Sequence, residues 1–535
     1  MMSGTVRLYD TTLRDGAQRE GISFSVADKL GIARKLDELG LDYIEGGWPG
    51  ANPKDSEFFA RASELNLVRA QLVAFGSTRR RGLRAEEDPG LAALISSGVK
   101  VATIVGKASA PQVTQVLEVS LAENLAMVAE SVAYLKSQGM TVFFDAEHFF
   151  DGYKADRDYA CSVLCEAVRA GADCLVLCDT NGGSLPEEVE VTVAEVGRAT
   201  TAPLGIHAHN DAELAVAVTL AAVKGGAAQV QGTINGYGER AGNANLCSII
   251  PALKLKMGLD CISDAELACL TDVSRMVSEV ANLTPDAFLP YVGASAFSHK
   301  GGLHVSGMRK WSGSYQHIDP SRVGNQPRTL VSELAGRANI IERAKEIGVD
   351  LASQGKEAQE LLGKVKLLES RGFQYENAQA SFDLLVWRAQ PDYRALFELI
   401  DFMVIVEKSR RLGSVQHGEE ILSEAMVKVR VGQDVMHTAA EGDGPVNALD
   451  NALRKALCQS YPRLSAVKLV DYKVRILEES TGTESQVRVL IESSDGMEQW
   501  RTVGSSTNII EASWLALADS LEYWLLKCYG GQTAP

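Results

Sequence analysis

The chain has 535 residues, a formal net charge of −16 and a pI of about 5.1. A surface of that sign repels phosphate backbones and anionic lipid head groups, so we expect no nucleic-acid partner and no membrane. Hydrophobic residues make up 46% and charged residues 23% of the sequence, a balance typical of globular proteins rather than disordered or fibrous ones. The length predicts roughly two to four domains.

The sequence predicts neither an N-terminal signal peptide nor a zinc knuckle. Met1–Tyr9 has no basic stretch followed by an apolar run, and no apolar run of roughly 18 residues follows, so we expect a cytoplasmic protein. The cysteine pairs Cys161/Cys165 and Cys174/Cys178 have i,i+4 spacing, unlike the C-x-x-C pairs of zinc knuckles. We expect these cysteines to be buried thiols.

From Val6 to about Lys256, short β-rich runs alternate with longer helical patterns, which indicates successive βα units. The eight predicted strands are Val6–Tyr9, Tyr43–Glu45, Leu72–Phe75, Val101–Ile104, Thr141–Asp145, Cys174–Cys178, Leu204–His207 and Gln229–Thr233. The predicted helices between them include Ser25–Leu39, Leu121–Ser137, Asp156–Ala170, Pro186–Ala199 and Asp211–Val223. Eight units predict a TIM (β/α)8 barrel at residues 1–265. The competing doubly wound sheet is disfavoured because no G-x-G-x-x-G follows the first strand.

The remaining chain has a different pattern. Helices are predicted at Leu267–Asn282 and in the region 332–370, so helical linker or lid subdomains are expected at 266–410. Beyond a linker near 408–422, a separate α+β domain is expected at 420–530. Its predicted strands are Ala425–Val431, Ala466–Leu477 and Gln486–Ile491. Its predicted helices are Pro445–Cys458 and Ile510–Lys527.

Polar residues gather where the predicted barrel strands end, and TIM-barrel active sites form at that end. His207 and His209 lie two positions apart on a strand, so their side chains point to the same face. Opposite Asp15, which follows the first strand, they can converge on one ion. This nitrogen and oxygen set suits Zn, Mn or Co and tolerates Mg. The alternative is a pair of histidines bonded to loop carbonyls.

Two charged residues near this cluster have open roles. Arg14 can pair with a carboxylate such as Glu147, or it can stabilise negative charge that develops on oxygen. Glu147 follows the apolar run Val142–Phe144, where a carboxylate is costly unless it is paired or used. The run Arg79–Arg81 can meet a nucleotide phosphate, although such runs are usually a solvated face. The run Gly106–Ser109 lacks the earlier glycine of a Walker motif.

Several runs together resemble the signatures of the metal-dependent acyltransferases that include isopropylmalate, homocitrate and citramalate synthases. These runs are Leu13–Gly16, His207–Asp211, Gly238–Asn243, Phe297–His304 and Tyr315–Pro320, and Glu441–Val446 is similar to the regulatory domain of that family. Three further runs look most like one citramalate synthase branch, which joins acetyl-CoA to pyruvate. They are Phe75–Arg81, Phe144–Tyr153 and Val323–Asn325.

The resemblance implies roles for individual residues. It implies a divalent metal ion (Mn, Mg, Zn or Co) on Asp15, His207, His209 and Asn243. Catalytic roles are implied for Arg14, Glu147, His304 and Tyr315, and substrate-binding roles for Arg14 and Thr180. We also expect Gln18 and Asp145 in the substrate-binding set, although better-known relatives tend to carry Ser or Tyr at the position of Asp145, so its role is open. Because His304 lies outside the barrel, a lid or a partner subunit must supply it, and we expect a homodimer. The implied function is the first step of a threonine-independent route to isoleucine, with isoleucine as the allosteric inhibitor.

Other functions stay open at this stage. Departures from isopropylmalate synthases at Ala17, Ala241 and Val305–Ser306 count against that activity, and the runs that resemble the citramalate synthase branch favour pyruvate over 2-oxoisovalerate. The alternatives are a 2-isopropylmalate synthase with leucine as inhibitor, a lyase on the same scaffold, and an inactive metal-binding regulatory protein. A sugar-phosphate barrel would need a phosphate site where His209 and Asn243 stand.

Overall fold

The computed structural model describes residues 5–299, 304, 307–308, 310–329, 341, 343–345, 347–349, 356–375, 378–391, 393–408, 421–477 and 485–529. Most of the linker predicted near 408–422, and much of the helical region predicted from residue 332, lie outside these residues. The chain divides into two compact units. One comprises residues 1–297 with 316–327, and the other comprises 298–315 with 328–535. The domain boundaries expected from the sequence stay predictions.

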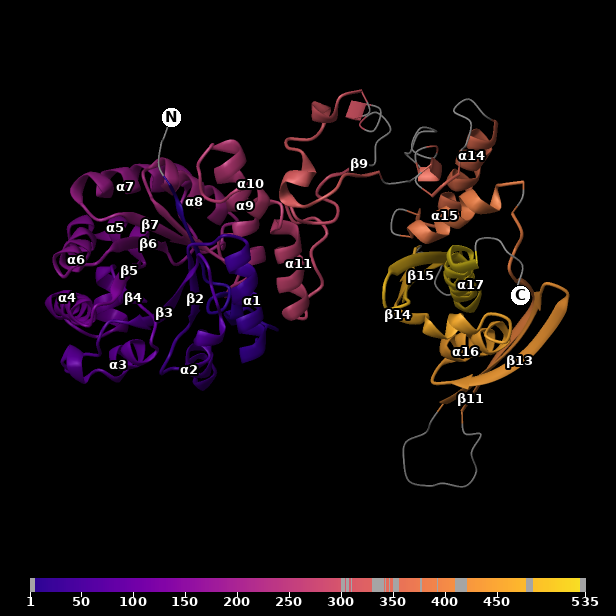
Figure 1. Ribbon diagram of the computed structural model, residues 1–535, viewed down its shortest axis with the longest axis horizontal. Coiled ribbons are helices and arrows are strands. Elements are labelled where there is room, and N and C mark those ends of the chain that lie inside the picture. Colours follow the sequence, from indigo (N-terminus) through magenta and orange to yellow (C-terminus); the bar gives the residue numbers. More distant parts are fainter. Residues whose placement is uncertain are drawn as a thin grey trace, which may run out of the picture. The chain divides into compact units, whose positions relative to one another are not determined.

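In the first unit, eight parallel strands close into a barrel in chain order, and the last strand pairs with the first (Figure 1). The strands are β1 (Arg7–Asp10), β2 (Tyr43–Gly47), β3 (Gln71–Ser77), β4 (Val101–Lys107), β5 (Thr141–Glu147), β6 (Cys174–Asp179), β7 (Leu204–Ala208) and β8 (Gln229–Gly232). Each corresponds to a strand predicted from hydrophobic runs. The predicted TIM barrel is therefore confirmed.

Helices surround this barrel (Figure 1). They are α1 (Val26–Glu38), α2 (Pro53–Ala60), α3 (Pro89–Ser96), α4 (Leu121–Ser137), α5 (Phe149–Ala155), α6 (Arg157–Arg169), α7 (Pro186–Ala199), α8 (Ala215–Lys224), α9 (Leu246–Pro251), α10 (Asp264–Leu267) and α11 (Leu270–Val280). Side-chain caps start several of them, since Ser25, Ser120 and Asp156 each accept a backbone N–H of the first turn. The predicted helices between the strands are confirmed.

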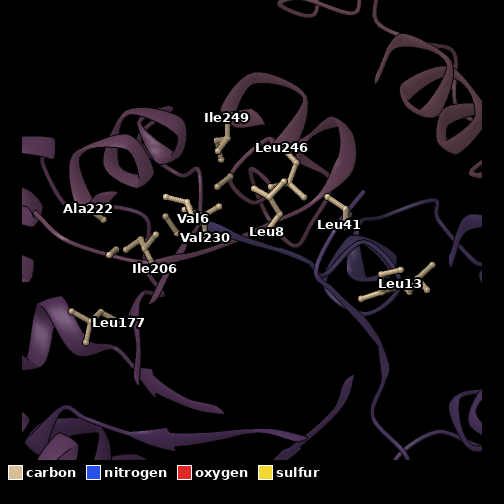
Figure 2. Packing of buried hydrophobic residues seen from close by; sticks show 14 of the residues in the cluster. Val6, Leu8, Leu13, Leu41, Leu177, Ile206, Ala222, Val230, Leu246 and Ile249 are labelled. Carbon is tan, nitrogen blue, oxygen red and sulfur yellow. The ribbon is translucent and has the colours of Figure 1, made fainter. Parts of the chain in front are cut away.

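Side chains of the strands alternate between two apolar layers. Leu8 and Val230 point outward and pack with residues such as Leu246 and Ile249 of α9 (Figure 2). Tyr9 points inward, because successive residues of a strand face opposite sides. The barrel interior is filled by Tyr9, Val73, Val101, Phe143, Cys174, Val176 and Cys178. Because the barrel interior is packed with side chains, a substrate can bind only at the ends of the strands.

The cysteine expectation is only half right. Cys174 and Cys178 are buried inside the barrel, as expected. Cys165 is exposed and Cys161 is half-buried, because the face of α6 that packs on the barrel carries Tyr159 and Val163 instead. All nine cysteines are free.

The second unit carries two antiparallel three-stranded sheets. One sheet contains β11 (Glu398–Lys408), β12 (Ile421–Val431) and β13 (Asp434–Gly442), with α16 (Pro445–Leu457) packed on it. The other contains β14 (Lys468–Ile476), β15 (Val487–Ser494) and β16 (Gln499–Ser506), with α17 (Ile509–Tyr529) packed on it. The predicted α+β character is confirmed. The unit also holds the short parallel pair β9 (Ser298–His299) and β10 (Arg328–Thr329), and the helices α14 (Lys356–Ser370) and α15 (Gln379–Arg388).

Among the described residues, no helix combines the length and the apolar character that a membrane crossing requires.

Candidate active site

Asp15, His207 and His209 come together at the carboxyl ends of the barrel strands. Asp15 precedes the short helix η1 (Gly16–Gln18) after β1, whereas His207 lies in β7 and His209 follows it. His207 Nε2 lies 3.4 Å from Asp15 Oδ2 and 3.4 Å from His209 Nε2. All three residues are buried. The structure thus brings together side chains that were grouped from strand spacing alone.

Asn243 joins this cluster through a β-bridge to His209. Its Nδ2 lies 3.3 Å from Asp15 Oδ2 and 3.3 Å from His207 Nε2, while its buried Oδ1 has no hydrogen-bond partner among the described residues. Gly238 permits this close packing, because a Cβ at that position would lie 1.9 Å from Asn243 Oδ1. The oxygen and nitrogen of an amide exchange places on a flip, so Asn243 can present an oxygen to the cluster.

Gln231 sets the orientation of the His207 ring. His207 Nδ1 lies 2.8 Å from Gln231 Oε1, which can only accept, so we assign the proton to Nδ1 and a lone pair to Nε2. Nδ1 of His209 is buried, and no described residue hydrogen-bonds to it. Burial, followed by repulsion from His207, lowers the pKa of His209 to about 4. The His209 ring is therefore neutral near pH 7, the form that binds metals.

These donors fit a divalent metal ion. Ligand atoms 2.0–2.2 Å from one ion lie about 3.0–3.6 Å from each other, a range that includes the spacings around His207. After an amide flip, the unsatisfied Oδ1 of Asn243 would face the cluster, where it and the lone pair of His207 are atoms that an ion would engage. Among the described residues, no group of three or more His, Cys, Asp or Glu side chains is arranged to hold a metal ion by itself. Both oxygens of Asp15 accept hydrogen bonds from Arg14, and the fit therefore includes the amide of Asn243.

Arg14 is held by carboxylates on two sides. Its Nη2 donates to Asp15 Oδ2 at 3.0 Å, and its Nε donates to Glu45 at the end of β2. Its guanidinium carbon lies 3.7 Å from the centroid of the Phe75 ring. Burial opposes the charge, but Asp15 and Glu45 outweigh it and raise the pKa of Arg14 above its ordinary value. The suggested pairing of Arg14 with Glu147 is wrong, because Glu45 lies on the strand next to β1.

Glu147 pairs with Lys107 instead. The Lys107 Nζ lies 2.5 Å from Glu147 Oε2, and the two residues close the neighbouring strands β4 and β5 in register. The next residue, His148, adopts a left-handed backbone conformation with φ of 56°. Its N–H donates to Thr180 Oγ1 at 2.8 Å, which ties the end of β5 to the loop after β6. Glu147 and Thr180 are thus held on adjacent parts of the barrel mouth.

Asp145 is connected to the histidine cluster. It accepts a hydrogen bond from Gln231 Nε2 at 3.3 Å, and Gln231 in turn binds His207. Burial, followed by repulsion from Glu45, raises the pKa of Asp145 well above its ordinary value. Gln231 was not singled out from the sequence, and Glu45 was noted only as the polar end of the second predicted strand. The signal for Gln231 was its place two residues after Gln229 in a predicted strand, which puts both amides on one face.

The side chains of the remaining candidates make no hydrogen bond or ion pair with this cluster among the described residues. Gln18 is exposed at the end of η1, where its backbone N–H donates to the Asp15 carbonyl. His304 and Tyr315 belong to the second unit, where their rings stack with centroids 4.2 Å apart. Their part in the barrel site stays a prediction.

The fold and the site define a TIM-barrel enzyme with its polar machinery at the strand ends, and family models agree. The model described as HMGL-like matches residues 5–277. A homocitrate synthase post-HMGL domain-like model matches 291–372, and the LeuA allosteric (dimerisation) domain matches 394–525.

Relatives that align over nearly the whole chain identify the family more closely. The chain is 54% identical to the (R)-citramalate synthase of Geobacter sulfurreducens, covering 98% of both chains. It is 51% identical to the (R)-citramalate synthase of Aquifex aeolicus, covering 98% of this chain and 99% of that one. The probable 2-isopropylmalate synthase of Methanopyrus kandleri is 33% identical, with 96% and 97% covered. The chain belongs to the citramalate synthase family of acyltransferases, as the sequence motifs indicated.

Proposed function

We propose that the barrel mouth joins acetyl-CoA to pyruvate and releases citramalate and CoA. The observation that carries this proposal is identity above 50% with (R)-citramalate synthases over nearly the whole chain. The convergence of Asp15, His207 and Arg14 at the strand ends supports it. The isopropylmalate alternative is disfavoured because that relative is 33% identical.

Asp15, His207, His209 and Asn243 would hold a divalent ion. When bound, the ion supplies charge that polarises the keto group of pyruvate and neutralises the oxygen anion formed there. One carboxylate, two imidazoles and one amide make a mixed donor set. Such a set suits Mn, Zn or Co and tolerates Mg.

Arg14 and Thr180 would hold the keto acid. The guanidinium of Arg14 has five N–H groups, and three donate to Asp15 and Glu45. Two N–H groups therefore remain for the oxygens of the substrate. The Thr180 hydroxyl accepts from the His148 N–H, so its own proton is available to the substrate carboxylate. Asp145 and Gln18 complete the proposed substrate-binding set. Burial raises the pKa of Asp145, which disfavours the negative charge that would repel an anionic keto acid.

Carbon–carbon bond formation requires a base. We assign His304 to take a proton from the acetyl methyl group, with Tyr315 stacked on its ring and Glu147 assisting. The resulting enolate carbon attacks the keto carbon of pyruvate, and the keto oxygen gains the negative charge and then a proton. Water then attacks the thioester carbonyl, and the carbon–sulfur bond breaks to release CoA. A positioned base contributes roughly 10²–10⁴-fold in rate.

Thiol release from acetyl-CoA tests this proposal when it is measured in parallel with pyruvate and with 2-oxoisovalerate. We expect citramalate and one equivalent of CoA with pyruvate, and a lower kcat/KM with 2-oxoisovalerate. The substrates differ by two methyl groups, and a pocket distinguishes each methylene by only about 1–3 kcal/mol. A preference for 2-oxoisovalerate would overturn the choice of pyruvate.

The outer face of one C-terminal sheet supports a homodimer. The match of residues 394–525 to the LeuA allosteric (dimerisation) domain supports regulation by an end product, which we propose to be isoleucine. Met403, Met426 and Ala439 lie opposite one another across β11, β12 and β13. Their row is on the face away from α16, because the alternate residues Ala425 and Val427 are the buried ones. An apolar row on an outer sheet face fits burial against a second copy.

A further inference from the structure

A cavity of about 340 Å³ lies beside Glu147, where β3 and β4 end. Arg80 and Arg81 line it from the turn after β3, and Lys107 lines it from the end of β4. Other walls are apolar and come from the segment around the π-helix η4 (Gln112–Val116) and from α4. These apolar residues are Val116, Leu117, Val119 and Met127. The cavity therefore combines a basic edge with an apolar surface.

The first arginine of the run is structural. Arg79 is buried, its Nε donates to Glu130 at 2.6 Å, and its Nη1 donates to Glu123 at 2.8 Å. Its backbone N–H donates to Ser131 Oγ at 2.8 Å, so the turn is anchored to α4. The expectation of a solvated arginine run is wrong for Arg79.

The next two arginines have no carboxylate partner among the described residues. The backbone N–H of Arg80 donates to Asp88, but no described residue forms a hydrogen bond or an ion pair with its guanidinium. Arg81 Nη1 donates to the carbonyl of Glu118 at 3.3 Å, which is not a charged partner. Lys107 is already paired with Glu147. The cavity edge therefore carries two guanidinium groups without a carboxylate partner among the described residues, and guanidinium groups bind phosphate with paired N–H donors.

We propose that this cavity binds the nucleotide part of the acetyl-CoA substrate, with Arg80 and Arg81 on its phosphates. The inference rests on the proposed function, because it takes the thioester to be the substrate. The nucleotide of CoA carries three phosphate groups and an adenine, which match the basic edge and the apolar wall. Glu147 lines the cavity, and the adjacent His148 is bonded to Thr180. A CoA anchored there would have its thioester arm within the barrel mouth, on the side of Glu147 and Thr180.

The variant Arg80→Gln/Arg81→Gln tests the site without disturbing the core, because both side chains are exposed. The matched control is Arg84→Gln, an exposed arginine that pairs with Glu87 and does not line the cavity. KM and kcat are measured for acetyl-CoA and for acetyl-pantetheine, which lacks the nucleotide. We expect the KM for acetyl-CoA to rise roughly 10- to 100-fold in the double variant, since hydrogen bonds to charged groups are lost. In the double variant, we expect the KM for acetyl-pantetheine and the KM for pyruvate to stay unchanged. In the control variant, we expect all of these KM values to stay unchanged.

Two outcomes would overturn the inference. One is an unchanged KM for acetyl-CoA in the double variant. The other is an equal rise for both thioesters, which would show that the arginines do not act through the nucleotide. Failure of the proposed function is distinguishable, because the unmodified enzyme would then release no CoA with pyruvate. In that case, calorimetric titration with CoA decides the matter: weaker binding by the double variant supports the cavity, and equal binding refutes it.

Discussion

Replacing Gln231 with Leu removes the group that fixes the tautomer of His207. In the native protein, His207 Nδ1 donates to Gln231 Oε1 at 2.8 Å, and the lone pair of Nε2 faces Asp15 and His209. Without this acceptor, His207 gains freedom to protonate Nε2 and to rotate. Loss of such a supporting hydrogen bond lowers metal affinity about 10- to 100-fold, or about 1.4–2.7 kcal/mol.

Isothermal titration with Mn or Zn measures that affinity directly, and thiol release measures the turnover. We expect the turnover of Gln231→Leu to recover at high metal concentration, since the ligands themselves remain. The matched control is Gln229→Leu, which removes a buried amide on the same face of β8 that is hydrogen-bonded to Gln231 rather than to His207. Thermal unfolding of both variants separates the loss of stability from the loss of metal affinity. The reasoning is refuted if Gln231→Leu binds metal as tightly as Gln229→Leu does.

Four further outcomes are expected. Arg14→Lys keeps a charge but loses the planar fork that binds Asp15 and Glu45, so kcat in the thiol-release assay should fall by roughly 10²–10³; near-native turnover would contradict its role. His304→Ala should lower turnover by roughly 10²–10⁴ with metal affinity unchanged, and normal turnover would remove it as the base. Met403→Glu/Met426→Glu should give monomers in light scattering, whereas an intact dimer would place the interface elsewhere. Isoleucine should lower activity of the full chain more than leucine does, and the reverse preference would reassign the inhibitor.

The barrel and its histidine pair could be predicted because both depend on how side chains alternate between the two faces of a strand. A strand shows its inward and outward faces in the sequence, so the spacing of His207 and His209 was enough to assign them to one face. Asp15 could be added because barrel strands all end at the same mouth. Asn243 required the family resemblance, since the loop that returns it to His209 depends on close packing at Gly238.

Pairings across the barrel were harder to predict. Arg14 was suggested to contact Glu147, yet Glu45 is the carboxylate on the strand that pairs directly with β1. Strand adjacency alone would have favoured Glu45. Arg79 shows the same limit, because its partners Glu123 and Glu130 lie seven residues apart on one face of α4. The sequence alone does not distinguish an exposed arginine from a buried one that is paired, because the pairing depends on where α4 packs.

The charges at the barrel mouth disfavour an ionised Asp145. Asp15 and Glu45 contribute two negative charges, and Arg14 contributes one positive charge. A divalent ion on Asp15 and the histidines would bring the sum to one positive charge, which an anionic keto acid would neutralise. Ionised Asp145 would leave one uncompensated negative charge in a buried site, and such a charge is costly. Burial and the neighbouring Glu45 oppose that ionisation and raise the pKa of Asp145, although Arg14 and the hydrogen bond that Asp145 accepts from Gln231 act in the other direction.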